Sequence, residues 1–353
     1  MSRLWKNGQL WEALSFLLPF FVLQTFLLIS ACEKKFSESP SSPMTMGTGD
    51  ITGNYFQIGD FLSKILNSNL EKYNLKLEVI STDGSTYNID ALLKKKLMLG
   101  IVQSDRQFQA YYGVGDWEKV GAQKELRSVL SLYPESITLI VSEKSEITTL
   151  RGIVGKRVNL GNPGSGQLNN SLHILNAIGL KESDFDAQHL RPLEAIREMR
   201  EGKLDAFFYT VGHPSSSIKN LSMQMKIRLI PLDGKEIDSL LEKYPYYSRT
   251  MIPVTTYPLS VNNRNIPSIG VYSTILTSSK VDEETIYAFT KEFCAIIPRL
   301  KDESALYQSV SVDKLLDNLS APIHPGALKY YREAKLFKKI PAFLESVSET
   351  KNE

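Results

Sequence analysis

Glycines and hydroxyl side chains gather in a loop that lies between a predicted strand and a predicted helix. This loop contains Gly47, Thr48, Gly49, Gly53 and Tyr55. Glycine lets a ligand approach the backbone closely, and the free N–H groups at the start of a helix favour an anionic group. The glycine spacing differs from the dinucleotide fingerprint, and no Gly-Lys-Ser or Gly-Lys-Thr phosphate motif occurs. A structural turn without a ligand is the alternative.

Two further loops of the same kind follow in the first half of the chain. The candidate ligand contacts in them are Thr82, Gly84, Ser85, Gln103, Ser104 and Asp105. Each loop alone could be an ordinary turn or a helix cap, with Ser85 or Ser104 as the capping residue. Loops that follow parallel strands meet at one edge of the sheet, where ligands bind in open α/β folds. The three loops together therefore predict one binding site.

The second half of the chain contains two more candidate segments. The first combines glycines with a hydroxyl before a predicted helix, so its backbone N–H groups and Ser165 could donate to a carboxylate. The second follows a predicted strand and offers donors beside an aromatic wall. Their candidate contacts are Pro163, Gly164, Ser165, Gly166, Tyr209, Thr210, Gly212 and His213. A helix-entry turn is the alternative for the first segment.

Catalytic motifs have weak support in this sequence. The histidines at 173, 189, 213 and 324 lie far apart and lack a metal-ligand spacing. No G-x-S-x-G elbow occurs, and His213 next to Pro214 is interpreted as a hydrogen-bonding residue rather than a base. We therefore predict a binding protein with no catalytic residues, no metal and no cofactor, and keep an exported enzyme as the less favoured alternative.

Short apolar runs alternate with amphipathic helical patterns, which is typical of an α/β protein. We predict two lobes with a cleft between them, formed by residues 44–147 and 148–262, with residues 263–340 returning to the first lobe. Within the first lobe, Leu126–Leu132 and Ile137–Val141 are predicted as separate strands. Tyr244–Pro267 contains four prolines, so it is predicted to lack regular structure and to cross between the lobes.

The first residues have the pattern of an export signal. Arg3 and Lys6 precede an apolar run from Ala13 to Ile29, and Ser30-Ala31 stand before Cys32. We predict a lipoprotein signal peptide over residues 1–31, lipidation of Cys32, and a flexible tether over 32–43. The protein would then lie in the periplasm, or on the outer face of the cytoplasmic membrane. An uncleaved signal anchor is the alternative.

The remaining composition limits the choice of partners. The net charge is +2, and basic and acidic residues are interspersed along the chain rather than forming a basic stripe. Nucleic acid is therefore not an expected partner, and we expect a monomer. Residues 341–353 are expected to form a disordered tail.

At the candidate loops the sequence resembles the TAXI-type receptors of tripartite ATP-independent periplasmic (TRAP) transporters. The resemblance covers nearly the whole mature chain in the family's order. Its main segments are GTGDITGNYFQIG (47–59), STDGS (81–85), LGIVQSD (99–105), SLYPE (131–135), LRGIVGKRVNLGNPGSG (150–166), GKLDAFFYTVGHPS (202–215) and HPGALKYYREAKL (324–336). It implies a two-lobed fold similar to type II periplasmic solute-binding proteins.

The resemblance also implies a function. The receptor would bind glutamate-like amino acids, 2-oxoglutarate or a related carboxylate, and deliver it to TRAP membrane subunits. Two positions depart from the family pattern: Asp50 replaces a usual glycine, and Gln167 replaces a usual threonine. A carboxylate near the cleft would repel an anionic solute unless Asp50 points away. A ligand sensor or surface antigen with the same fold is the alternative function.

Overall fold

The computed structural model describes residues 43–68 and 75–345. The predicted signal peptide, the lipidation site Cys32 and the predicted tether up to residue 42 lie outside the described residues. The strands are β1 (Met44–Gly47), β2 (Leu77–Ile80), β3 (Leu99–Gln103), β4 (Leu126–Ser142), β5 (Arg157–Asn159), β6 (Asp186–Gln188), β7 (Ala206–Val211), β8 (Ile227–Ile230), β9 (Ser248–Ile252) and β10 (Ile266–Ser278).

The α-helices connect these strands and cover them. They are α2 (Asn54–Asn67), α4 (Ser85–Leu93), α5 (Ser104–Tyr112), α6 (Gly166–Ala177), α7 (Pro192–Arg200), α8 (Ser216–Ser222), α9 (Lys235–Lys243), α10 (Glu283–Glu303) and α11 (Pro325–Glu333). The longest, α10, is capped by Asp282, whose side chain accepts a hydrogen bond from the Thr285 N–H. Its buried residues, including Ile286, Phe289 and Phe293, recur at helical spacing and face the core.

The strands form a single hydrogen-bonded sheet in the order β2-β1-β3-β10-β4-β7-β5-β6, with β8 on β4 and β9 on β10. The pairs β1/β2, β1/β3, β5/β6 and β5/β7 are parallel, whereas β4 and β10 run antiparallel to their neighbours. Parallel pairs joined by helices give two α/β units, one built around β1–β3 and the other around β5–β7. These two units are the two predicted lobes.

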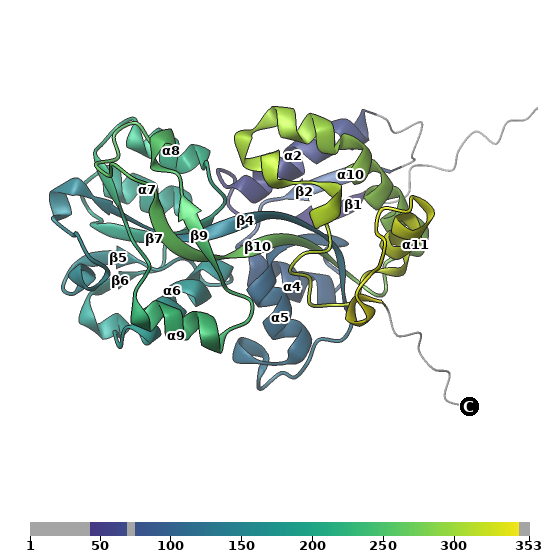
Figure 1. The fold of residues 1–353 in the computed structure, drawn as a ribbon, viewed down its shortest axis with the longest axis horizontal. Coiled ribbons are helices and arrows are strands. Elements are labelled where there is room, and N and C mark those ends of the chain that lie inside the picture. The colour runs from purple at the N-terminus through teal and green to yellow at the C-terminus, as the bar shows by residue number, and fades with distance from the viewer. Residues whose placement is uncertain (1–42, 69–74, 346–353) are drawn as a thin grey trace, which may run out of the picture. The chain divides into compact units, whose positions relative to one another are not determined.

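Strands β4 and β10 run through both lobes, and they can be followed across the middle of Figure 1. The first part of β4 pairs with β10, and its last part, Ser136–Ser142, pairs with β7 and β8. The separate strands predicted at 126–132 and 137–141 are therefore one strand. The prediction for Tyr244–Pro267 is wrong in both parts. The segment contains regular structure, β9, which pairs with β10 at Ile266–Gly270, and it is β10 itself that continues into the first lobe.

Each lobe has apolar cores on both faces of its part of the sheet. In the first lobe, one core packs α2, α10 and α11 against the strands, and a second lies under α4 and α5. In the second lobe, α6 and α9 cover one face, while α7 and α8 cover the other (Figure 1). The carboxyl ends of β1, β3 and β7 are left to face the space between the lobes.

The end of the chain is more ordered than its composition indicates. Ala342–Leu344 forms a short 3-10 helix, and Leu344 is fully buried in the first lobe's core. The Ile323 N–H also donates to the Leu344 carbonyl over 2.7 Å. The predicted disordered tail is therefore wrong for residues 341–345, and its remainder lies outside the described residues.

Candidate ligand-binding site

A cavity lies between the two lobes, where strand ends from both lobes meet the starts of four helices. Its volume is about 70 Å³. Its lining comprises Gly49, Asp50, Gly53, Asn54, Tyr55, Thr82, Asp83, Gly84, Ser85, Gln103, Glu135, Asn162, Ser165, Gly166, Gln167, Arg191, Pro192, Tyr209, Thr210 and Val211. All five predicted segments therefore contribute residues to this one cavity.

Helix starts supply hydrogen-bond donors to this cavity. Helices α2 and α4 are preceded by Gly53 and Gly84, which have no side chain that could cap the first-turn N–H groups. Helix α6 is capped by Ser165, whose hydroxyl accepts from the Leu168 N–H over 3.1 Å. Orphan amides at a helix start carry partial positive charge. The walls formed by α2 and α4 can thus bind an anionic group.

The lobes are in direct contact around the cavity, so the structure shows the cleft closed. Lobe-to-lobe hydrogen bonds join Asn54 Nδ2 to the Gly212 carbonyl (2.9 Å), the Tyr87 N–H to the Gly164 carbonyl (3.1 Å), Ser217 Oγ to the Thr52 carbonyl (2.8 Å) and Asn170 Nδ2 to Asp105 Oδ2 (2.7 Å). These bonds form only when the lobes approach each other. They stabilise the closed state relative to an open one.

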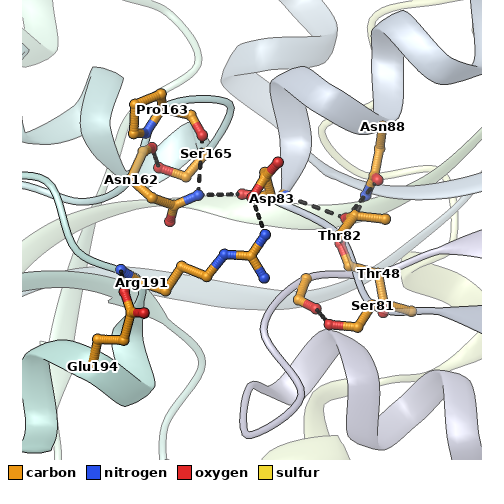
Figure 2. Close-up of polar contacts among 12 residues, drawn as sticks. Thr48, Ser81, Thr82, Asp83, Asn88, Asn162, Pro163, Ser165, Arg191 and Glu194 are labelled. Carbon is orange, nitrogen blue, oxygen red and sulfur yellow. Dashed lines mark hydrogen bonds and ion pairs between the residues drawn. The ribbon is translucent and has the colours of Figure 1, made fainter.

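Asp83 is the centre of another contact between the lobes, drawn in Figure 2. From the second lobe, Arg191 forms an ion pair with the Asp83 carboxylate, and Asn162 Nδ2 donates to the Asp83 carbonyl over 3.0 Å. Thr82 beside it is held by Asn88, whose Oδ1 accepts from the Thr82 hydroxyl over 2.8 Å. The loop 81–85 is therefore fixed from both sides once the cleft closes.

Removing the ion pair is expected to weaken ligand binding only modestly. Both side chains are more than a third exposed, and pairs of this kind contribute about 0.2–1 kcal/mol. We expect an Arg191→Gln variant to bind its solute about twofold to fivefold more weakly at low salt, with a smaller difference at high salt. Calorimetry at two salt concentrations measures this. Asp83→Asn removes the same ion pair through its other partner, so it should give the same salt-dependent loss of affinity. A loss of affinity that does not depend on salt would contradict this explanation.

Two buried carboxyl groups lie at or behind the cavity. Glu135 lines it, and burial raises the pKa of Glu135 to about 8. Asp105 lies behind it at the contact with Asn170, and burial raises the pKa of Asp105 to about 6. Removal from water disfavours the charged form of each acid. At neutral pH the empty site therefore contains a largely protonated Glu135.

The two departures from the family pattern both lie in the cavity wall. The Asp50 carboxylate accepts hydrogen bonds from the Thr52 N–H (2.9 Å) and hydroxyl (2.6 Å), so it is held in a local turn. Gln167 donates from Nε2 to the Phe208 carbonyl over 2.8 Å and packs closely against Gly161. Both residues line the cavity, so Asp50 adds negative charge to the site.

Most of the predicted contacts reach the cavity. Those that line it are Gly49, Gly53, Tyr55, Thr82, Gly84, Ser85, Gln103, Ser165, Gly166, Tyr209 and Thr210. Those placed elsewhere are Gly47, Thr48, Ser104, Asp105, Pro163, Gly164, Gly212 and His213. Several of the latter have structural partners; for example, Thr48 donates to the Ile80 carbonyl, Ser104 accepts from the Tyr272 N–H, and Gly212 accepts from Asn54.

His213 is half-buried and lies outside the cavity lining. Its ring nitrogens contact the hydroxyls of Thr138 (2.9 Å) and Tyr257, and burial lowers the pKa of His213 to about 3. The ring is therefore neutral at physiological pH and holds the end of β7 in place. This matches the interpretation of His213 as a hydrogen-bonding residue, but not its prediction as a lining residue.

Several lining residues were not predicted from the sequence. They are Asn54, Asp83, Glu135, Asn162, Arg191, Pro192 and Val211. Asp83, Asn162 and Asn54 lie inside or next to the predicted loops, so including every polar loop residue would have found them. Glu135 lies within β4, and Arg191 precedes α7, and neither position carries a loop pattern.

Within residues 43–68 and 75–345, no group of three or more His, Cys, Asp or Glu side chains is placed so that it could hold a metal ion. Over the same part of the chain, no helix is both long enough and apolar enough to cross a membrane.

A cavity between two α/β lobes, with strands running through both, defines the class of this protein: it has the two-lobed type II periplasmic-binding-protein fold, as predicted. The chain belongs to the NMT1-like family, whose profile matches residues 46–334.

Solved structures with a similar arrangement are distant in sequence. The periplasmic aliphatic sulphonate binding protein SsuA from Escherichia coli is 17% identical, with a TM-score of 0.44 and 83% of each chain covered. A protein from Bordetella bronchiseptica RB50 is 14% identical, with a TM-score of 0.49, covering 87% of this chain and 92% of that one. A Candida albicans gene product described as exhibiting the generic periplasmic binding protein fold is 16% identical, with a TM-score of 0.44 and coverages of 84% and 81%.

Proposed function

We propose that this protein is an extracytoplasmic solute-binding receptor whose lobes close over a small solute. The observation that carries the proposal is the cavity lined by both lobes and surrounded by hydrogen bonds between them. A solute that contacts both walls would favour the closed state over an open one, and a ligand can shift an equilibrium only by such a difference in affinity. Membership of the NMT1-like family is consistent with this role.

The solute is a small carboxylate or amino acid. Its size is limited by the closed cavity of about 70 Å³. The uncapped starts of α2 and α4 and the hydroxyl of Ser85 supply donors suited to a carboxylate. Glutamate and 2-oxoglutarate are the compounds that the resemblance to TAXI receptors suggests.

The solute is handed to the membrane subunits of a TRAP transporter, and a lipid on Cys32 holds the receptor at the membrane. Both statements follow from the resemblance and from the sequence before residue 43. Uptake into vesicles that contain the membrane subunits tests the first. Uptake driven by an ion gradient without ATP supports a TRAP transporter, whereas dependence on ATP would show an ABC-type importer instead. Mass spectrometry of the mature N-terminus tests the lipid.

Isothermal calorimetry against amino, oxo and dicarboxylic acids tests the ligand class. We expect saturable binding of at least one compound, together with a decrease in the radius of gyration in solution scattering. Heat without compaction would contradict closure. The absence of binding to any compound would contradict the proposed function.

A further inference from the structure

Glu135 places an unused hydrogen-bond acceptor in the wall of the cavity. The residue lies in β4, and its side chain is buried. The Tyr55 hydroxyl donates to Oε2 over 2.6 Å. The second carboxyl oxygen accepts no hydrogen bond from the described residues, although Glu135 lines the cavity. This oxygen is therefore available, once Glu135 is ionised, to an occupant of the cavity that brings a donor.

The charges around the cavity also favour a cationic group. Three carboxyl groups line it, at Asp50, Asp83 and Glu135, and the cation among the lining residues, Arg191, is already paired with Asp83. Gln103 adds another acceptor, because its buried Oε1 has no hydrogen-bond partner among the described residues. An occupant that carried only negative charges would be repelled by these carboxyl groups.

The groups that face Glu135 come from four elements. They are Tyr55 on α2, Tyr133 on β4 itself, Tyr209 on β7 and Asp105 on α5. Within the described part of the chain, none of the charged groups that act on Glu135 is a cation. Burial accordingly raises the pKa of Glu135 to about 8, and the proton remains on the empty site at pH 7.

The starts of α2 and α4, in contrast, favour a negatively charged group. There the backbone N–H groups following Gly53 and Gly84 can bind a carboxylate. The cavity thus combines an anion-binding wall with a carboxyl group that lacks a cation. A small molecule that carries both a carboxylate and a protonated amine matches both.

We propose that Glu135 binds the protonated amine of an α-amino acid, and that it thereby distinguishes the amino acid from the 2-oxo acid with the same carbon skeleton. This inference rests on the proposed receptor function and names the solute class for the same site. The amine replaces the proton on Glu135, and that proton leaves to the solvent as the complex forms.

Proton release gives the inference a distinct pH dependence. Below pH 8 the empty site must lose a proton before Glu135 can pair with an amine, so affinity for an amino acid rises by up to tenfold per pH unit between pH 6 and 8. Above pH 8 Glu135 is already ionised and the rise levels off. An anionic ligand that needs protonated Glu135 would show constant affinity below pH 8 and weaker binding above it.

The experiment compares matched pairs of ligands by calorimetry in buffers of different ionisation enthalpy. The pairs are L-glutamate with 2-oxoglutarate and L-leucine with 4-methyl-2-oxopentanoate. With the wild-type protein we expect at least one amino acid to bind at least tenfold more tightly than its oxo acid, with release of close to one proton at pH 7. Glu135→Gln should remove both the preference and the release, and Glu135→Asp should retain part of each.

Glu242→Gln is the matched control, because it makes the same change at an exposed glutamate outside the cavity lining. It should leave the proton release between pH 7 and 8 unchanged, and thermal unfolding of each variant shows that it is folded. Equal binding of an amino acid and its oxo acid, or proton uptake on binding, would overturn the role of Glu135 and leave the receptor function standing. No binding of any compound would overturn both.

Discussion

A Gly166→Ala variant is expected to bind its solute about a hundredfold more weakly than the wild-type protein. Gly166 begins α6 in the second lobe and lines the cavity. In the closed state, a Cβ atom at this position would lie 1.6 Å from Gln103 Oε1 and 3.2 Å from Arg106 Cγ, both in the first lobe. Either Gln103 leaves the cavity wall or the lobes stay apart, and both outcomes weaken binding.

The same substitution should hardly change stability without ligand, because an open cleft separates residue 166 from Gln103. Arg106 cannot move aside easily, since its guanidinium pairs with Asp116 and stacks on Trp117 at 4.6 Å. Calorimetry gives the affinity, and solution scattering shows whether the variant still compacts on binding. Gly152→Ala is the control, because a Cβ there meets its neighbours at 3.4 Å or more. Wild-type affinity in Gly166→Ala would show that closure does not need this contact.

A Gly270→Ala variant is expected to lose about 3 kcal/mol of unfolding free energy. Gly270 lies in β10 opposite Ser136, where β10 and β4 pair between the lobes. A Cβ atom would lie 1.9 Å from the Glu135 carbonyl oxygen and 3.0 Å from Thr250 Cγ2. The carbonyl belongs to the backbone, so the strands themselves must separate.

Urea unfolding measures this loss, with Gly152→Ala again as the control near zero. The damage should also reach the cavity, because the displaced carbonyl belongs to Glu135. We therefore expect the variant to bind more weakly even when it is folded. A change in stability below 1 kcal/mol would mean that the strands adjust at little cost.

The predicted binding loops came from a physical rule that the structure confirms. Glycines and hydroxyls after parallel strands do meet at the sheet edge, so Thr82, Ser85 and Ser165 line one cavity, whereas Thr210 reaches it from within β7. The rule could not say which loop residues point inward. Thr48 and Ser104 have the expected composition, yet their side chains bond to the backbone of neighbouring strands.

Glu135 was missed because its environment depends on contacts that are distant in sequence. A glutamate next to a proline within an apolar segment gives no periodic signal, and two separate strands were expected around it. Its burial arises because β4 continues past Pro134 and packs under Tyr55, eighty positions earlier in the chain. Arg191 is similar, since only lobe closure brings it to Asp83.

The order of strands also determines when the first lobe can fold. Its sheet runs β2-β1-β3-β10-β4, so an interior strand comes from residues 266–278, far along the chain from its neighbour β3 at 99–103. Closing so long a loop is slow, and until then β3 and β4 keep unpaired edges that are prone to aggregate. A chain still emerging from the ribosome or from a membrane pore cannot complete this lobe. Folding of this lobe must therefore wait until β10 is available, and a chaperone that shields residues 99–142 would protect the chain meanwhile.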